Sequence, residues 1–288
     1  MGKHAYLIMA HSDWNMLNTL LELIDDKRND IYIHIDKKST FDLHNIYSTK
    51  YSKYYYIKRK NVSWGGDTQI RCELDLLKSA INGRYDYYHL LSGVDLPIKT
   101  QDEIHNFFDL NNGKNYISLD SNAMKNNNFI NRCLQYHFLQ NKIGRNNGKI
   151  IALYSLLEKN CISLQKMLGV NRIKNIPMKL YKGANWFSIT HEMAKIIVSN
   201  EKIIKKYFYK GICTDELFLQ TIAYNSHMRH TIVNENLRYI DWNRGSPYIF
   251  QLSDYNSLIN NENKLFARKF SSEVDKEVIE SIKLYLKK

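Results

Sequence analysis

Proline, cysteine and long apolar runs are scarce in this sequence, and each scarcity excludes a class of protein. Only 3 of the 288 residues are proline, too few for a flexible hinge between domains. The four cysteines, Cys72, Cys133, Cys161 and Cys213, are widely spaced, which excludes a CxxC metal site and a dense disulfide framework. No stretch approaches the roughly 20 apolar residues that a membrane-spanning helix needs. We therefore expect one domain over residues 1–288, with reduced thiols.

The apolar run at the amino terminus, residues 5–10, is too short to span a membrane and is followed by no small-residue cleavage site. We interpret it as a first buried strand. With no secretory signal in view, we expect a cytoplasmic protein.

The sequence also lacks an Asp-x-Asp motif, the usual carboxylate pair that holds a divalent ion against a nucleotide-sugar diphosphate. His34 and Asp36 are spaced so that they could bind a metal in principle. A metal site needs further convergent ligands, and one His with one carboxylate on a strand more often marks a packed strand end. We expect no metal ion and no other cofactor.

Positive charge, in contrast, is abundant. There are 41 Lys and Arg against 29 Asp and Glu, a formal net charge of +12. Such a surface attracts anions, whether nucleotide phosphates, nucleic acid or an acidic lipid leaflet, and the sign of the charge alone does not choose among them. Hydrophobic residues make up 44% of the chain, ample for one extensive core.

Periodicity along the chain predicts an α/β fold that opens with a strand, a helix and a second strand. We expect strands at residues 6–10, 31–36, 54–62, 87–92, 186–190, 231–233 and 237–240, and helices at 13–24, 67–81, 149–168, 191–199 and 215–223. Open α/β sheets bind ligands at the carboxyl ends of their strands. His11, Asp36, Trp64 and Asp95 directly follow such ends.

Two segments stand apart from this pattern. Residues 121–174 are rich in Asn, Lys and Gln, and their one clear helix stops at Gly169, a typical residue for a helix end. We expect an excursion from the sheet there, on the acceptor side. Residues 278–288 read as a Lys-rich amphipathic helix, usually a solvated face, with attachment to a membrane surface as the alternative.

A Trp-containing turn, residues 183–190, and a carboxylate pair at a helix start, Asp215 and Glu216, suit an enzyme of sugar transfer. The turn would pack a sugar ring and a carboxylate would remove a hydroxyl proton. Acidic residues also favour the first helical turn for purely structural reasons, so the pair alone does not decide. Further on, Arg244 and the pair Arg268 and Lys269 supply cations that could replace a metal at a leaving diphosphate.

Several blocks together resemble the core-2/I-branching β-1,6-N-acetylglucosaminyltransferase family, which includes peptide O-xylosyltransferases. The resemblance spans nearly the whole chain and rests on its blocks occurring in the family order. The blocks are residues 5–11 (AYLIMAH), 32–38 (YIHIDKK), 62–66 (VSWGG), 85–100 (YDYYHLLSGVDLPIKT), 183–190 (GANWFSIT), 214–216 (TDE), 237–242 (LRYIDW) and 265–270 (LFARKF).

The resemblance implies a GT-A glycosyltransferase fold, with a mostly parallel central sheet flanked by helices, and an inverting transfer that proceeds without a metal. It makes Glu216 the catalytic base, with Asp215 orienting it or capping the helix. It places Lys269 at the donor diphosphate and Arg244, at a different spacing from the family's, beside it.

The same resemblance implies donor-binding roles for the strand-end residues. His11 and Asp36 would lie at the nucleotide, and Trp64 and Asp95 would fall near the same cleft. Trp186 and Trp242 offer flat apolar faces for sugar rings, although a buried tryptophan is often simply part of the core.

The expected partners follow from this family. The donor would be a UDP-sugar, with UDP-N-acetylglucosamine the first to test and UDP-xylose and UDP-galactose open. The animal enzymes have a membrane anchor and disulfides that this chain does not show. The acceptor expected here is a glycan or lipid-linked glycan of a surface polysaccharide, with peripheral contact to an anionic membrane and no nucleic acid.

The alternative is a non-catalytic protein that binds nucleic acid or acidic glycan. Residues 50–60 interleave Tyr with Lys and Arg, so that rings could stack on bases and cations could meet phosphates. An edge strand with Lys on its outer face accounts for the same stretch.

Overall fold

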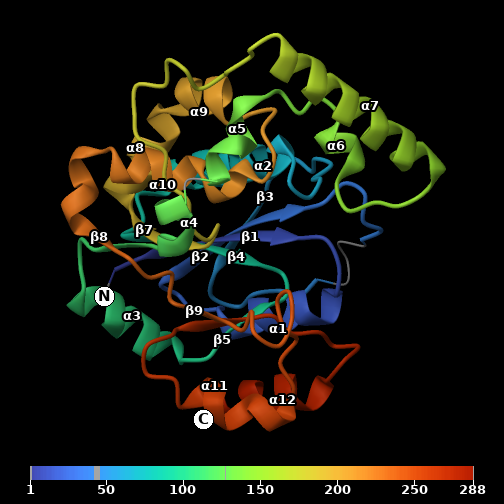
Figure 1. The fold of residues 1–288 in the computed structure, drawn as a ribbon. Coiled ribbons are helices and arrows are strands. Elements are labelled where there is room, and N and C mark those ends of the chain that lie inside the picture. The colour runs from blue at the N-terminus through green and yellow to red at the C-terminus, as the bar shows by residue number, and fades with distance from the viewer. Residues whose placement is uncertain (1, 42–45, 127, 288) are drawn as a thin grey trace.

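A computed structural model of the protein describes residues 2–41, 46–126 and 128–287. At its centre is a seven-stranded sheet of order β3-β2-β1-β4-β7-β6-β8, with helices on both faces (Figure 1). Strands β3, β2, β1 and β4 are mutually parallel, β7 is antiparallel to both of its neighbours, and β8 is parallel to β6. The strands are β1 His4–Ala10, β2 Asn29–Ile35, β3 Lys53–Tyr56, β4 Tyr87–Ser92, β6 Asn115–Ile117, β7 Phe187–Thr190 and β8 Ile232–Val233. This arrangement confirms the predicted α/β class.

The core lies on both faces of this sheet, which explains the near-continuous apolar sequence of its central strands. In β1, Leu7 packs into one hydrophobic cluster, while Tyr6 and Ile8 pack into the other. The first cluster is covered by α2, α8, α9 and α10, and the second by α1, α3, α11 and α12 (Figure 1). These helices are α1 Trp14–Leu23, α2 Asp67–Ala80, α3 Gln101–Leu110, α8 His191–Ser199, α9 Glu201–Tyr207, α10 Phe218–Tyr224, α11 Tyr255–Ile259 and α12 Lys276–Leu286.

Two predicted elements differ from the structure in their bounds. The strand predicted at residues 54–62 ends at Tyr56. Beyond it, the amide of Ile57 still donates to the carbonyl of Ile33 at 3.0 Å, and the amide of Lys60 donates to the side chain of His34, at Nε2, at 3.0 Å. The helix predicted at residues 215–223 begins as a 3-10 turn, Thr214–Glu216 (η4), before α10. The carbonyl of Glu216 accepts the amide of Gly183 at 3.0 Å and so takes part in a loop contact.

A second, three-stranded sheet was not predicted as a separate unit. It has the order β5-β10-β9, from β5 Asp95–Pro97, β9 Arg238–Ile240 and β10 Phe266–Arg268. The strands predicted at 231–233 and 237–240 therefore belong to different sheets, since β8 pairs with β6 and β9 pairs with β10. This small sheet brings the carboxyl-terminal cations beside the end of β4.

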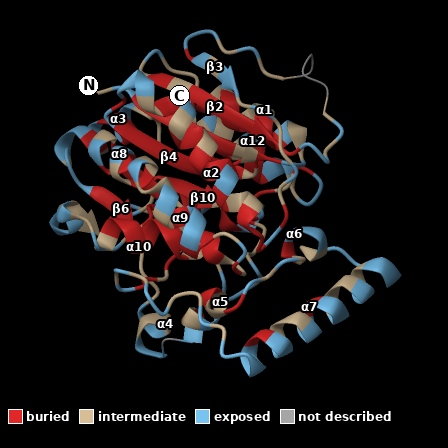
Figure 2. Cartoon of the chain, turned by 90° about the horizontal axis from the view of Figure 1, so that it is seen from above, coloured by how far each residue is buried: buried red, intermediate tan, exposed pale blue. Residues whose placement is uncertain are grey.

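Residues 121–174, which we predicted to be an excursion from the sheet, contribute no strand to either sheet in the described part, from which residue 127 is missing. They contain α4 Ser121–Asn126, the turn Asn128–Ile130 (η3), α5 Asn131–Leu134, α6 Gln140–Ile143 and α7 Lys149–Met167. Gly169 follows α7 with φ +65°, the left-handed conformation expected at a helix end. In Figure 2, α7 lies at the margin of the molecule, next to α6. That the chain is one domain stays a prediction.

Residues 50–60 and 278–288, for which the sequence left two interpretations open, contain an edge strand and a helix packed on the core. The strand β3 lies at the edge of the large sheet, and Tyr55 stacks on Tyr32 with 4.6 Å between ring centroids. In α12 the apolar face is buried through Val278, Ile279 and Ile282; residue 288 of the predicted helix lies outside the described part. Across the described residues, we find no helix with both the length and the apolar character to cross a bilayer.

Candidate functional site

The parallel strands β1, β2 and β4 end at one edge of the sheet, and two predicted site residues meet there. The amide of Asp36 donates to the carbonyl of Ala10 at 2.9 Å, and the amide of Gly93 donates to the carbonyl of Met9 at 3.0 Å. These contacts hold His11, which follows β1, beside Asp36, which follows β2. Burial lowers the pKa of His11, and the nearby cations Arg268, Lys269 and Lys38 lower it further against the opposing effect of Asp36.

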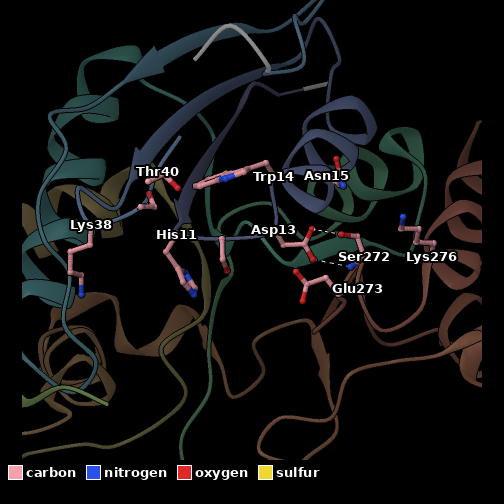
Figure 3. Close-up of a pocket in the computed structure, with 11 residues that line it drawn as sticks. His11, Asp13, Trp14, Asn15, Lys38, Thr40, Ser272, Glu273 and Lys276 are labelled. Atoms are coloured by element: carbon pink, nitrogen blue, oxygen red, sulfur yellow. Dashed lines mark hydrogen bonds between the residues drawn. The ribbon is translucent and has the colours of Figure 1, made fainter. Parts of the chain in front are cut away.

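A cavity of about 810 Å³ opens at this edge (Figure 3). Its wall is mostly polar, with one aromatic ring and charges of both signs, and it is lined by His11, Ser12, Asp13, Trp14, Asn15, Lys38, Ser39, Thr40, Ser272, Glu273 and Lys276. Asp13 closes the far side, because its carboxylate accepts Ser272 Oγ at 2.6 Å and the Ser272 amide at 2.8 Å. The cavity therefore joins the amino-terminal strand ends to the carboxyl-terminal segment.

Asp36 and His34 have different surroundings although both lie at the end of β2. The Asp36 carboxylate accepts the amide of Lys38 at 2.9 Å and lies 3.7 Å from Lys38 Nζ. His34 is buried, and its Nε2 accepts the amide of Lys60. His34 thus serves the packing of the strand end, and Asp36 is the member of the pair beside the cavity.

Asp95 holds an arginine instead of facing open space. It is fully buried, and its carboxylate accepts the Ser92 amide at 2.8 Å, Ser92 Oγ at 2.7 Å and Arg268 Nη1 at 2.7 Å. The antiparallel register of β5 and β10 sets this pair, because Arg268 lies directly opposite Asp95. The Arg268 guanidinium in turn lies 4.5 Å from the ring centroid of Trp186.

The two cations predicted at the diphosphate differ in their partners. Arg244 is paired with Asp241 at 2.5 Å and Asp254 at 2.7 Å, and its guanidinium lies 3.9 Å from the Tyr248 ring centroid. For Lys269, no carboxylate of the described residues forms an ion pair. Burial lowers the pKa of Lys269, and the neighbouring Arg268 and Arg145 lower it further. Lys269 is thus a cation surrounded by cations, which favours an anionic ligand.

The remaining tryptophans lie on separate loops. Trp64 is 45% exposed, and the guanidinium of Arg145, from the excursion, lies 4.1 Å from its ring centroid. Because Arg145 also acts on the pKa of Lys269, Trp64 belongs to the same neighbourhood. Trp242 is 64% exposed on the loop after β9, and no described contact joins it to Glu216.

Glu216 lies against the Trp-containing turn, so the two blocks singled out in the sequence come together. Two hydrogen bonds join the turn to the segment that carries Glu216. The amide of Gly183 donates to the carbonyl of Glu216, and Gln220 Nε2 donates to the carbonyl of Ala184 at 2.6 Å. The Glu216 carboxylate accepts Arg132 Nη1 at 2.6 Å and lies 3.7 Å from Lys182 Nζ. Its side chain is 38% exposed, so it is both held by cations and reachable from outside.

Asp215, in contrast, points into the core. It is buried, and its Oδ2 accepts Gln69 Nε2 at 3.2 Å. Glu73 is fully buried near it and accepts Asn185 Nδ2, from the Trp186 turn, at 3.0 Å. Burial and, to a smaller extent, the charge of Glu216 together raise the pKa of Asp215 to about 7; burial and the charge of Asp215 likewise raise the pKa of Glu73. That Asp215 orients Glu216 or caps the helix stays a prediction.

We expect Asp215→Asn to stabilise the protein in a pH-dependent way. With its pKa raised to about 7, folded Asp215 keeps a proton that the unfolded chain loses near pH 4, so its contribution to stability falls as pH rises through this window. A raise of this size corresponds to at most about 4 kcal/mol. Urea unfolding should show the variant gaining about 2–4 kcal/mol relative to wild type between pH 5 and pH 8. An equal difference at both pH values would contradict this assignment.

With this geometry in place, comparison with known proteins identifies the family. Residues 4–259 match the core-2/I-branching enzyme family over most of the chain. The chain belongs to this family. Xylosyltransferase 2 of Homo sapiens is 25% identical over 313 aligned residues, which cover 98% of this chain and 33% of that protein. Xylosyltransferase 1 of Homo sapiens is 24% identical over 314, covering 98% of this chain and 30% of that protein.

The family assignment confirms the resemblance drawn from the sequence blocks, and with it the GT-A-like fold. This core-2/I-branching family member spans about a third of the length of the curated relatives it matches. Membership in a family of enzymes disfavours the non-catalytic binding protein.

Several residues around the site were not predicted from the sequence. Arg132 and Lys182 contact Glu216, Gln69 and Glu73 surround Asp215, and Arg145 covers Trp64. Arg132 and Arg145 come from the excursion, where nothing in the sequence distinguishes them from solvated cations. Glu73 carries a usable signal: it is a carboxylate among the buried positions Cys72, Leu74 and Leu77 of α2.

Proposed function

We propose that this protein is an inverting glycosyltransferase that moves a sugar from a UDP-sugar to a hydroxyl of a glycan or lipid-linked glycan, without a metal ion. One observation carries the proposal. The turn of residues 183–186 contacts both parts of the proposed site: the amide of Gly183 donates to the backbone carbonyl of Glu216, and the ring of Trp186 lies against Arg268, which precedes Lys269. A candidate base and candidate phosphate ligands thus share one neighbourhood.

In the proposed reaction, Glu216 accepts the proton of the acceptor hydroxyl while that oxygen attacks the anomeric carbon from the face opposite UDP. The bond between this carbon and the phosphate oxygen breaks, and its electron pair leaves with the diphosphate. Arg132 and Lys182 hold the Glu216 carboxylate in place for this step.

The negative charge that develops on the departing diphosphate would be stabilised by Lys269, whose ammonium group is paired with no carboxylate of the described residues. Arg268 supports it from the Asp95 pair and keeps the ring of Trp186 in place for the donor sugar. Arg244 is already bound to two carboxylates, so we assign it to fixing the loop around Tyr248 and give it the smaller role at the phosphates.

The nucleoside would occupy the cavity at the sheet edge. Trp14 offers a flat face there, and Lys38 and Lys276 add positive charge. Asp36, at the end of β2, is the hydrogen-bond acceptor we assign to the ribose hydroxyls, with His11 beside it. Neither Glu216 nor Lys269 is among the residues that line this cavity, so the proposed site extends beyond it toward the Trp186 turn.

The donor sugar and the setting are proposals on the same basis. We propose N-acetylglucosamine as the first donor sugar to test, because the chain resembles N-acetylglucosaminyltransferases. Xylose is the second, because the relatives named above are xylosyltransferases. We propose a role in surface polysaccharide synthesis on the cytoplasmic side of a membrane.

Hydrolysis of a panel of UDP-sugars tests the activity without knowledge of the acceptor. We expect one donor to be turned over, and UDP to raise the thermal unfolding midpoint, equally with EDTA and with Mn²⁺. Activity that requires added Mn²⁺ would overturn the metal-independent mechanism but would not contradict the proposed sugar transfer. Salt-sensitive retention of nucleic acid with no effect of UDP would instead support the binding protein.

A further inference from the structure

Helix α7 exposes many apolar residues, although an ordinary surface helix buries its apolar face. The residues it buries are Glu158 and Gln165. Leu156 and Met167 are exposed, and so is a row formed by Ile150 at 67%, Leu153 at 54%, Leu157 at 48%, Leu164 at 54% and Leu168, directly after the helix, at 70%. The spacing of three, four and seven residues within this row puts it on one side of the helix. Figure 2 shows α7 at the margin of the molecule, next to α6, and blue or tan along most of its length.

The polar face explains why this apolar stripe is left over. Glu158 accepts the amide of Leu139 at 3.0 Å and lies 3.3 Å from His137 Nδ1. Gln165 exchanges hydrogen bonds with the backbone of Tyr136, at 2.7 Å and 2.9 Å. The helix is therefore attached to the excursion through hydrogen bonds. Its apolar stripe does not contribute to this attachment, and a contiguous exposed apolar stripe on a soluble surface marks a binding face.

The charges beside the stripe identify the partner. The exposed charged residues of α7 are Lys149, Lys159 and Lys166, and its one acidic residue, Glu158, is buried. The adjacent α6 adds Lys142, whose Nζ lies 5.1 Å from the Tyr154 ring centroid. A second copy of the chain would bring like charges together with no acidic residue to pair them. An anionic lipid surface accepts both the apolar stripe and the cations.

We propose that α7 lies in the interface of an anionic bilayer, with Ile150, Leu153, Leu157, Leu164 and Leu168 inserted at the acyl boundary and its lysines at the lipid phosphates. Membrane contact is thereby assigned to α7, since the apolar face of α12 is buried in the core. Arg145, between α6 and α7, stacks on Trp64, so the bound bilayer would lie on the excursion side of the site. The docking of α7 is independent of the proposed function. Only the further step, that this orientation presents a lipid-linked acceptor to the site, rests on the proposed function.

Flotation of the full chain with vesicles tests the docking. We expect binding to phosphatidylcholine vesicles containing phosphatidylglycerol and little binding to pure phosphatidylcholine. The double variant Leu153→Ser with Leu157→Ser should weaken binding at least tenfold, which is about 1.4 kcal/mol. Lys159→Gln and Lys166→Gln should each weaken it about fivefold. Leu284→Ser, at a 66% exposed leucine of α12, is the matched control and should bind as wild type.

Unfolding midpoints close to wild type should accompany these losses, because every substituted side chain is exposed. Wild-type binding by the double variant, or equal binding to neutral and anionic vesicles, would overturn the proposal. A dimer in solution that the double variant dissociates, with no vesicle binding, would show that a second copy covers the stripe. Hydrolysis of the UDP-sugar by the α7 variants should be unchanged, which separates this test from that of the proposed function.

Discussion

Replacing Glu216 with glutamine should lower sugar transfer by roughly 10²–10⁴-fold, the range of a lost general base, and leave the affinity for UDP within about twofold of wild type. Glutamine keeps the shape of the side chain and can still accept the hydrogen bond from Arg132 through its amide oxygen. It cannot accept the acceptor's proton under these conditions. Because Glu216 does not line the nucleotide cavity, binding of UDP should not depend on its charge.

Initial rates of transfer and calorimetric titration with UDP would measure the two effects separately. Glu192→Gln is a suitable control, because that carboxylate is 63% exposed on α8 and pairs only with Lys195 among the described residues. Transfer within tenfold of wild type would remove Glu216 from the base role. A large loss of UDP affinity in the same variant would mean that Glu216 acts on the donor.

The parts of this fold that were predicted are those in which local pattern and burial agree. The apolar residues 5–10 and 87–92 are buried on both faces of the sheet, and helix α8 buries the apolar face that its sequence period indicates. The small sheet could not be predicted in this way. Each of its strands is three residues long, and its register joins Asp95 to Arg268 across 173 residues, so no local pattern reveals it.

The site was predicted one residue at a time, and the contacts between those residues were not. The sequence favoured Glu216, His11 and Lys269 without showing what holds them. Arg268 and Lys269 are adjacent cations, and only the register of β10 with β5 shows that Arg268 pairs with Asp95 while Lys269 stays available. Arg132 reaches Glu216 from 84 residues away, in a segment whose cations all look alike in the sequence.

The second large effect is on the stability of the fold at low pH. It arises from three histidines buried together: His4 in β1, His89 in β4 and His105 in α3. His4 and His105 stack with 4.0 Å between ring centroids, and His89 Nε2 lies 3.2 Å from His4 Nδ1. His105 Nε2 is hydrogen-bonded to Asn29 Oδ1 at 2.9 Å. All three are fully buried, and no carboxylate of the described residues forms an ion pair with any of them. Protonating them in place would create adjacent buried charges.

Acid should therefore destabilise the protein between about pH 6.5 and pH 4. Burial lowers the pKa of His105 to about 4, with Arg28 adding to the effect, and burial holds the pKa of His4 and of His89 well below the ordinary value. The unfolded chain takes up protons near pH 6.5 and the folded chain does not, so stability falls as pH falls. Each histidine contributes about 1.4 kcal/mol per pH unit, and the three together are comparable to the whole stability of a typical domain.

A single variant isolates this effect from the buried carboxyls Asp215 and Glu73, whose raised pKa values act in the opposite direction over the same window. His105→Gln does not titrate and keeps an amide that can donate to Asn29 Oδ1. Urea unfolding at pH 7.5, 6.5, 5.5 and 4.5, as test conditions, should show its stability falling less steeply than wild type, by about 1.4 kcal/mol per pH unit. His227→Gln, at an exposed position, controls for the loss of a histidine. Parallel pH profiles for His105→Gln and wild type would show that His105 is protonated in the folded state and that the cluster tolerates charge.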